Sequence, residues 1–310
     1  MTDNVPLSVA QKIIRLSDND PHRMKYQKRE LQFYIDLMKR GDLDHLNIIR
    51  YYAFVEYNKS QEHHVFMELC DYTLEKLMKC GEWGEKPHAF KRHVISGICE
   101  GVQYLHRHRI IHRDINPANI LIKEEGSGFP TVKISDFNVY ALHAALKPEA
   151  SHTVGVGHSS YQAIEVRQII DEEGDGVAER ERAKYGCSAD IWSIGAIGYE
   201  ISTNTKFCEL TDRQIRKNKE LRENAFNIAE RIMKNIGDQK LQQFLYKCLR
   251  WDPSKRASCD KLLSNEFLVS KQPTDMTDSC QLDHETTQEE TEPMVVEQDI
   301  SPVAEVVEVG

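Results

Sequence analysis

The sequence lacks the features of a secreted or membrane-spanning protein. It contains no apolar run approaching about 18 residues, and its first residues do not form the charged-then-apolar pattern of a signal peptide. Its eight cysteines are scattered and include no Cys-x-x-Cys pair, which is typical of reduced thiols. We therefore expect a cytoplasmic chain that neither crosses a membrane nor depends on disulfides.

Excess charge is also lacking over most of the chain. Residues 271–310 carry eleven acids against one base, Lys271, which accounts for the whole net charge of −9 and leaves about +1 for residues 1–270. A nearly neutral body does not favour nucleic acid as a partner. The hydrophobic content of 40% suffices for a substantial core. Residues 270–310, rich in Thr, Glu, Gln and Pro, are predicted to form an acidic disordered tail.

Hydrophobic periodicity predicts a few strands and one helix, followed mostly by helices. Strands are expected at 7–16, 48–55, 65–69 and 132–134. Helices are expected at 22–40, 73–78, 87–108, 190–202 and, two or three of them, within 211–268. Residues 139–165 show no periodicity and are predicted to be a loop, and 171–184 a charged insertion. This order indicates an α+β fold with a small β-rich lobe and a larger α-helical lobe.

One stretch carries two acids and an asparagine at an informative spacing. His112-Arg113-Asp114-Ile115-Asn116-Pro117-Ala118-Asn119 is followed, after a predicted hairpin, by Asp136-Phe137-Asn138. An acid, an Asn five residues later and a second acid after a hairpin are the working parts of protein-kinase phosphoryl transfer. On these residues the chain resembles the eukaryotic protein kinase family of the Ser/Thr type, which implies a two-lobed fold with ATP bound between the lobes.

The resemblance implies a role for each residue of these motifs. Asp114 would accept the proton of the substrate hydroxyl, while Asn119 and Asp136 would hold Mg²⁺. Arg113 would pair with a phosphate placed on the loop at 139–165, which contains Ser151, Thr153, Ser159 and Ser160. The alternative, a polar loop that carries no phosphate, is equally open.

Upstream segments complete the resemblance. Val9-Ala10-Gln11-Lys12 matches the family strand whose lysine grips the α- and β-phosphates of ATP, and Glu30 would be the ion-pair partner of Lys12. Phe66-Met67-Glu68-Leu69-Cys70 resembles the hinge, with Met67 as gatekeeper and the backbone from Glu68 to Cys70 hydrogen-bonding adenine. The resemblance therefore implies ATP and Mg²⁺ as cofactors.

Downstream segments match as well. Residues 190–195 (Asp-Ile-Trp-Ser-Ile-Gly) match the helix that supports the catalytic segment in the family. Glu165 and Arg256 stand where the family has a buried structural ion pair. The resemblance thus implies a partial N-lobe at 1–70, without a glycine-rich loop, and a C-lobe at 71–269, followed by the acidic tail at 270–310.

Three departures bear on activity. Asn116 stands where Ser/Thr kinases carry a lysine that steadies the transferred phosphate, and losing such a contact costs about 2.7–4 kcal/mol, or about 10²–10³ in rate. Asn138 replaces a glycine that has wide backbone freedom. No glycine-rich loop precedes the first predicted strand, either because it is lost or because the sequence is part of a longer chain; without it, nucleotide affinity should fall.

Two functions from different classes follow. The first is a protein serine/threonine kinase with weakened catalysis, acting on a protein substrate. The second is a pseudokinase that binds nucleotide or docks a partner. Residues 47–52 (Asn-Ile-Ile-Arg-Tyr-Tyr) are also similar to the endoplasmic-reticulum stress sensor kinase–ribonucleases, and this analogy implies a dimer. The acidic tail stands where that group has its ribonuclease domain, so we expect no ribonuclease activity.

Overall fold

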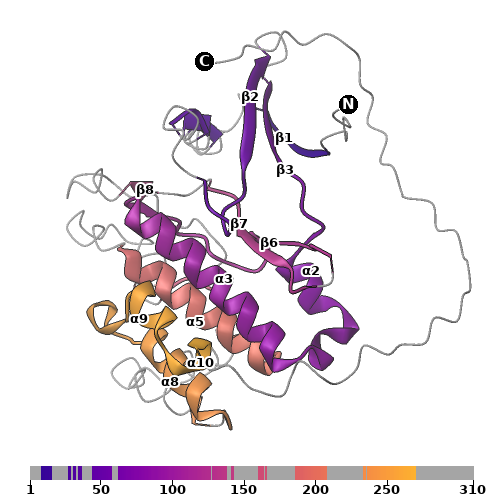
Figure 1. Cartoon of the computed structure of the whole chain (residues 1–310). Helices are drawn as coiled ribbons and strands as arrows, with labels where there is room; N and C mark the ends of the chain where they lie inside the picture. Colours follow the sequence, from indigo (N-terminus) through magenta and orange to yellow (C-terminus); the bar gives the residue numbers. More distant parts are fainter. Residues whose placement is uncertain are drawn as a thin grey trace, which may run out of the picture. The chain divides into compact units, whose positions relative to one another are not determined.

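The computed structural model shows a body of short strands and helices (Figure 1). The residues that it describes are 8–15, 27–28, 31–32, 34–36, 44–57, 62–126, 128–137, 141–142, 160–163, 165, 186–207, 233–234 and 236–269. Several expectations fall outside them and stay predictions. They are those on Glu30, Asn138, the hydroxyl residues Ser151, Thr153 and Ser159, any helix within 211–232, the insertion at 171–184 and the tail at 270–310.

A three-stranded antiparallel sheet in the order β1-β3-β2 comes first in the chain. Its strands are β1 (Val9–Arg15), β2 (Tyr51–Tyr57) and β3 (Glu62–Glu68). Side chains alternate along a strand, and in β1 this places Lys12 on the less exposed face together with the buried Ile14. The strands predicted at 7–16 and 65–69 are confirmed, and the sheet gives the Lys12 side chain its direction.

The strand predicted at 48–55 starts later than expected. Residues 51–57 pair within the sheet, whereas Ile48 forms a bridge to Ile134 and the N–H of Ile49 donates to the Ile134 carbonyl at 2.9 Å. The apolar run concealed this boundary, because periodicity does not reveal which strand an apolar residue pairs with. These two contacts connect the chain segment just before β2 to Ile134, two residues before Asp136.

A second sheet has the order β4-β6-β7, and a two-stranded ladder joins β5 to β8. The bounds are β4 (Tyr72–Thr73), β5 (Ile110–Ile111), β6 (Ile120–Lys123), β7 (Thr131–Ile134) and β8 (Ala141–Leu142). The loop predicted throughout 139–165 is wrong at β8. A two-residue strand is too short to show periodicity, and its partner β5 lies far upstream.

Helices make up most of the remaining described chain (Figure 1). They are α2 (Leu74–Lys79), η1 (Gly81–Glu85), α3 (His88–Arg107), α5 (Cys187–Thr203), α8 (Gln239–Cys248), η4 (Pro253–Lys255), α9 (Cys259–Leu263) and α10 (Glu266–Val269). The helices predicted at 73–78, 87–108 and 190–202 are confirmed within a few residues. The described residues between 27 and 36 are helical as predicted. Within the described part of the chain, no helix combines the length and apolar character needed to cross a bilayer.

The long helix α3 approaches β7 closely. A Cβ added to Gly97 would lie 2.9 Å from the Cβ of Val132, and one added to Gly101 would lie 2.7 Å from Cδ1 of Ile134 and from the Asn47 carbonyl oxygen. Glycine at these two positions therefore permits the approach. Helix α5 packs against α3 and α8 and is buried along most of its length. The contact with α3 fixes the position of β7 and therefore of Asp136, which follows it. The packing of α5 places Asp190 inside the core.

Candidate active site

The ammonium of Lys12 lies beside the acid that follows β7. Lys12 Nζ donates to Asp136 Oδ1 at 3.1 Å, across 124 residues of sequence. The two side chains are 35% and 30% exposed, so the pair remains accessible to solvent and to a ligand. Asp136 has a φ of 63°, in the left-handed region that few residues other than glycine adopt. The expected partner, Glu30, lies outside the described residues.

The segment between β5 and β6 carries Asp114. Asn116 Nδ2 donates to Asp114 Oδ1 at 3.0 Å, and Asn119 Nδ2 donates to Asp114 Oδ2 at 2.9 Å. The same two amides donate to the Asp114 backbone carbonyl at 3.1 and 2.9 Å. Each carboxylate oxygen has two lone pairs. One amide therefore holds each oxygen of Asp114, which fixes the orientation of the carboxylate.

Asn119 connects this segment to the residue before Asp136. Its backbone carbonyl accepts from Ser135 N at 2.9 Å and from Ser135 Oγ at 3.0 Å. Because its side-chain nitrogen faces Asp114, its amide oxygen is the atom that can bind a cation. An amide oxygen and a carboxylate suit Mg²⁺, which also takes phosphate and water oxygens. The residues present thus fit Mg²⁺.

A self-sufficient metal cage is not found. Among the described residues, no group of three or more His, Cys, Asp or Glu side chains has the arrangement of a metal site. Asn119 and Asp136 would therefore hold Mg²⁺ only together with the phosphates of a nucleotide, as is usual for this ion.

Asp190, in the first turn of α5, anchors the backbone of the Asp114 segment. It is fully buried and accepts from His112 N at 3.0 Å and from Arg113 N at 2.8 Å. His106 Nε2, from α3, donates to the same carboxylate at 2.8 Å. Burial by itself would raise the pKa of Asp190, but the hydrogen bond and charge of His106, the charge of His112 and the Arg113 N–H together outweigh burial and hold that pKa below its usual range.

His106 is the matching half of this pair. Burial disfavours its charged form, yet its hydrogen bond to Asp190 raises the pKa of His106 well above its ordinary value of 6.5. The result is a buried ion pair between α3 and α5, whose carboxylate also holds the two backbone N–H groups before Asp114. Sequence reasoning missed His106, because nothing in its local pattern links it to a residue on another helix.

Four aromatic rings from distant segments contact one another in succession and end at His112, two residues before Asp114. Tyr34 lies 5.1 Å from Tyr51, Tyr51 lies 6.3 Å from Phe137, and Phe137 lies 4.9 Å from His112, all between ring centroids. His112 Nε2 donates to the Ser135 carbonyl at 3.0 Å. Aromatic pairs at such separations contribute about 0.5–1.5 kcal/mol beyond the burial of their area. They fix Phe137 and therefore the backbone on one side of Asp136.

The predicted hinge residues stand at the end of β3. The N–H of Glu68 donates to the Arg50 carbonyl at 2.8 Å. Met67 is partly buried and packs against the core. Burial raises the pKa of the Cys70 thiol to about 11, so this thiol stays protonated at neutral pH. The contact of this backbone with adenine stays a prediction.

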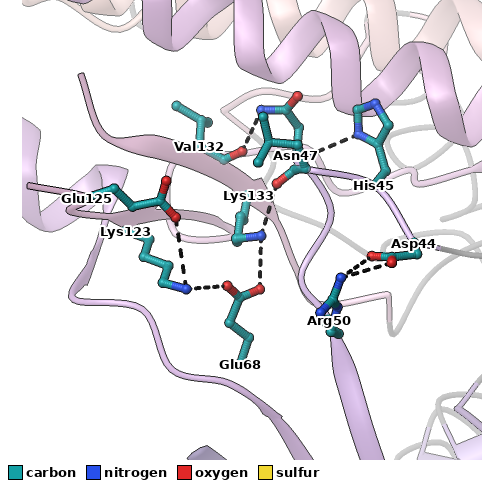
Figure 2. A network of polar contacts seen from close by, with 10 residues as sticks. Asp44, His45, Asn47, Arg50, Glu68, Lys123, Glu125, Val132 and Lys133 are labelled. Carbon is teal, nitrogen blue, oxygen red and sulfur yellow. Dashed lines mark hydrogen bonds and ion pairs between the residues drawn. The ribbon is translucent and has the colours of Figure 1, made fainter. Parts of the chain in front are cut away.

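Figure 2 shows a network around Glu68 that sequence reasoning also missed. Glu68 Oε1 lies 2.7 Å from Lys123 Nζ, and Glu68 Oε2 lies 2.9 Å from Lys133 Nζ. Lys133 is only 6% exposed and also donates to the Leu46 carbonyl at 3.0 Å. Burial would raise the pKa of Glu68, but the two ammonium groups outweigh burial and lower it. The network joins β3 to β6 and β7.

The predicted structural ion pair is confirmed. Arg256 Nη1 and Nη2 each lie 2.7 Å from one carboxylate oxygen of Glu165. The Arg256 guanidinium also lies 4.9 Å from the ring centroid of Trp192. The two-pronged geometry with a stacked ring is one that arginine makes and lysine does not.

The predicted role of Arg113 is not resolved by these contacts. Its backbone N–H is held by Asp190. Of the four hydroxyl residues in the loop that were predicted to take a phosphate, Ser160 is described, whereas Ser151, Thr153 and Ser159 lie outside the described residues. A pairing of Arg113 with a phosphate stays a prediction.

Two cavities open on the helical part of the described chain. One, of about 400 Å³, lies beside Met233 and Tyr246, and the other, of about 630 Å³, lies between Lys247 and Lys261. Neither is lined by a residue of the candidate site, so they are separate from the chemistry around Asp114.

Comparisons with known proteins give a family and a fold for this chain. A family model described as the protein kinase domain matches residues 3–268. Similar proteins include the cytokinesis protein sepH of Aspergillus terreus (29% identical over 279 residues, 88% of this chain and 17% of that protein). Mitogen-activated protein kinase kinase kinase 4 of Homo sapiens is 30% identical over 271 residues, 84% of this chain and 14% of that protein. Serine/threonine-protein kinase KIC1 of Saccharomyces cerevisiae is 28% identical over 271 residues, 86% of this chain and 22% of that protein.

The chain spans less than a quarter of each of these three relatives. Among solved structures, a chain in the crystal structure of the yeast RNA Pol II CTD kinase CTDK-1 complex superposes with a TM-score of 0.61 at 20% identity, over 85% of this chain and 86% of that chain. At this identity the likeness concerns the fold alone. It confirms the two-lobed α+β fold predicted from the sequence.

Proposed function

The chain belongs to the protein kinase family, and from this premise we propose that it transfers the terminal phosphoryl group of Mg-ATP to serine or threonine hydroxyls of a protein. One observation carries the proposal, a set of polar contacts that runs from Asp114 to Asn119, from Asn119 to Ser135, the neighbour of Asp136, and from Asp136 to Lys12. Phosphoryl transfer depends mainly on positioning and on electrostatic stabilisation. These contacts supply the positioning.

Each residue has one role in this proposal. Asp114, whose carboxylate is oriented by the amides of Asn116 and Asn119, accepts the proton of the attacking hydroxyl. Lys12 contacts the nucleotide phosphates from β1. Asn119 and Asp136 hold Mg²⁺, which when bound neutralises charge on the phosphates. Glu30, by its resemblance to the family residue, would pair with Lys12.

The proposed adenine contacts come from the end of β3. The backbone from Glu68 to Cys70 would hydrogen-bond the base, with Met67 beside it. The Glu68 side chain supports this assignment, because its two lysine partners hold the strand end against β6 and β7. A backbone held in this way loses little conformational entropy on binding.

A second candidate function is a pseudokinase scaffold that binds nucleotide or a partner without transfer. The observation that favours it is Asn116, which carries no charge and is only 2% exposed. In this case Lys12 and Asp136 retain a nucleotide as a structural ligand, and the conformation of the body is what a partner recognises.

The finer resemblance and the location belong to the same proposal. The likeness of residues 47–52 to the stress-sensor kinase–ribonucleases supports a kinase that responds to a signal, without the ribonuclease. All the cysteines in the described part of the chain are free thiols, which supports a reducing, cytoplasmic compartment.

The test uses the full chain, radiolabelled ATP with Mg²⁺, and two peptide mixtures whose hydroxyl residues are either Ser and Thr or Tyr. We expect transfer to the Ser/Thr mixture. Asp114→Asn keeps the shape but removes the base, so kcat should fall by about 10²–10⁴. Asp44→Asn is the matched control, because Asp44 is exposed and pairs with Arg50 away from the site, and kcat should not change.

Thermal unfolding with ATP, with and without Mg²⁺, separates the two functions. A nucleotide-dependent rise in Tm without transfer would favour the scaffold over the enzyme. If ATP neither raises Tm nor is used for transfer, the chain does not use nucleotide, and both functions that involve nucleotide would be contradicted. Transfer that persists unchanged in Asp114→Asn belongs to a contaminant, and the enzyme proposal would then fail.

A further inference from the structure

The side chain of Asn116 is turned inward. It is 2% exposed, and both ends of its amide are engaged. Nδ2 donates to Asp114 Oδ1 at 3.0 Å and to the Asp114 carbonyl at 3.1 Å. Oδ1 accepts from the backbone N–H of Ala118 at 2.9 Å. Little of the amide is therefore left to face a substrate.

The orientation of this amide follows from chemistry. With the amide flipped, an oxygen would face the Asp114 carboxylate and an NH₂ group would face the Ala118 N–H, so both hydrogen bonds would be lost. The orientation observed satisfies a donor and an acceptor at once. Asn116 is thus specified by the two groups on either side of it, the carboxylate of Asp114 and the N–H of Ala118.

We propose that Asn116 is a positioning residue for Asp114 and makes no contact with the transferred phosphate. This inference rests on the proposed function, since it assigns how the base of that reaction is oriented. Asn116 holds Oδ1 of the carboxylate and Asn119 holds Oδ2, so the acid cannot rotate about its last bond without breaking a hydrogen bond. The charge of the phosphate is left to Lys12 and to Mg²⁺.

The chain offers a matched control in Asn265. It is 4% exposed, and its Oδ1 accepts the backbone N–H of Phe267, two residues later, at 3.0 Å. Asn116 makes the same kind of contact with Ala118. Asn265 immediately precedes α10 and belongs to none of the site contacts described above. Its replacement therefore measures the general cost of removing a buried asparagine.

The kinetic arm compares Asn116→Ala, Asn116→Asp and Asn265→Ala in the full chain. We expect kcat of Asn116→Ala to fall about tenfold, as when one of two hydrogen bonds to a charged group is lost. The Kd for ATP should stay within about twofold of the wild type. Asn116→Asp should lower kcat further, by about 10², because two carboxylates then face each other.

The two alanine variants should differ in kcat and not in Tm. Asn265→Ala should lower Tm much as Asn116→Ala does and leave kcat unchanged. An equal loss of kcat in Asn265→Ala would reduce Asn116 to a structural residue. A loss that appears in the ATP Kd with kcat unchanged would indicate a phosphate contact. Either result overturns the proposal.

A second arm does not depend on activity. In a chain labelled with ¹⁵N-asparagine, the side-chain amide signal that disappears in Asn116→Ala identifies Asn116. Asp114→Ala should shift this signal and speed its exchange with solvent, while the Asn265 signal stays in place. An Asn116 signal indifferent to Asp114→Ala would overturn the proposal. If the wild type transfers no phosphate, the proposed function fails, and this arm alone decides whether Asn116 holds Asp114.

Discussion

The ammonium of Lys133 lies 2.9 Å from the carboxylate of Glu68. The two side chains are only 7% and 10% exposed, so the charges face each other with little solvent screening. Lys133 is the second-last residue of β7 and lies three residues before Asp136 in the sequence. Glu68 is the last residue of β3, at the start of the backbone segment predicted to contact adenine. The pair therefore joins the two ends of the proposed nucleotide site.

Replacement of Glu68 should destabilise the fold strongly. Glu68→Ala leaves the ammonium of Lys133 buried, with a hydrogen bond to the Leu46 carbonyl but no carboxylate beside it. Breaking a buried ion pair from one side costs about 3–5 kcal/mol. The double change Glu68→Gln with Lys133→Met removes both charges and should cost less than Glu68→Ala. The measurement is the free energy of unfolding in urea.

Glu56→Ala is the control for this experiment, because Glu56 is an exposed carboxylate on the neighbouring strand β2. Its free energy of unfolding should stay within about 0.5 kcal/mol of the wild type. A Glu68→Ala variant as stable as Glu56→Ala would mean that the pair contributes nothing.

Replacement of Asp136 should uncouple nucleotide binding from Mg²⁺. Asp136→Ala removes the proposed carboxylate ligand and also frees Lys12 from its ion pair. We expect ATP alone to raise Tm in the variant, and Mg²⁺ to add nothing further. Asp44→Ala, at an exposed ion pair, should keep the Mg²⁺-dependent part of the shift. If Asp136→Ala retains that part, Asp136 is not a metal ligand.

The buried pair of His106 and Asp190 predicts how stability depends on pH. Because the pKa of His106 is raised above its ordinary value of 6.5, the folded chain holds this proton more tightly than the unfolded chain. The contribution to stability is complete below pH 6.5 and is lost as pH rises through the raised pKa. Wild type should therefore lose stability on the alkaline side.

His106→Gln removes this titrating group. Its free energy of unfolding should lie below that of the wild type at about pH 6, and the gap should narrow as pH rises through the raised pKa of His106. His88→Gln, at the exposed first residue of α3, should keep the wild-type dependence. A gap between wild type and His106→Gln that is constant over the whole range would contradict the assignment of the charge to His106.

A lysine at position 116 should raise the rate of transfer. An ammonium keeps a donor near Asp114 and adds the charge that steadies a transferred phosphate, so we expect kcat of Asn116→Lys to rise about tenfold or more. The lost acceptor for the Ala118 N–H should lower stability by about 1 kcal/mol. Adding Asp114→Asn should abolish the gain, and a gain that survives it would not come from this site.

Local residue patterns were enough to predict several parts of the fold and the site. The strand with Lys12, the helix 88–107 and the spacing of Asp114 to Asn119 are short-range patterns, and the structure has them where they were predicted. The pair of Glu165 and Arg256 was also predicted, but from the family resemblance and not from any local pattern.

Apart from the pair of Glu165 and Arg256, the contacts between distant side chains described above were not predicted. The bond of Lys12 to Asp136, the two lysines on Glu68 and the pairing of His106 with Asp190 each join separate elements. Hydrophobic periodicity carries no information about which charged side chains meet. The boundary at Ile48 and the short strand β8 were missed for the same reason, since pairing partners far along the chain decide them.

The sequence alone determined the fold class and the residue types at the site, because motif spacing and apolar alternation are properties of the chain itself. Only the tertiary structure decided what Asn116 faces. A side chain of two torsions can point outward to a phosphate or inward to Asp114, and the packing that leaves it 2% exposed selects the inward direction. Burial of a polar group requires hydrogen-bond partners, and Asp114 and Ala118 are the partners that the fold provides.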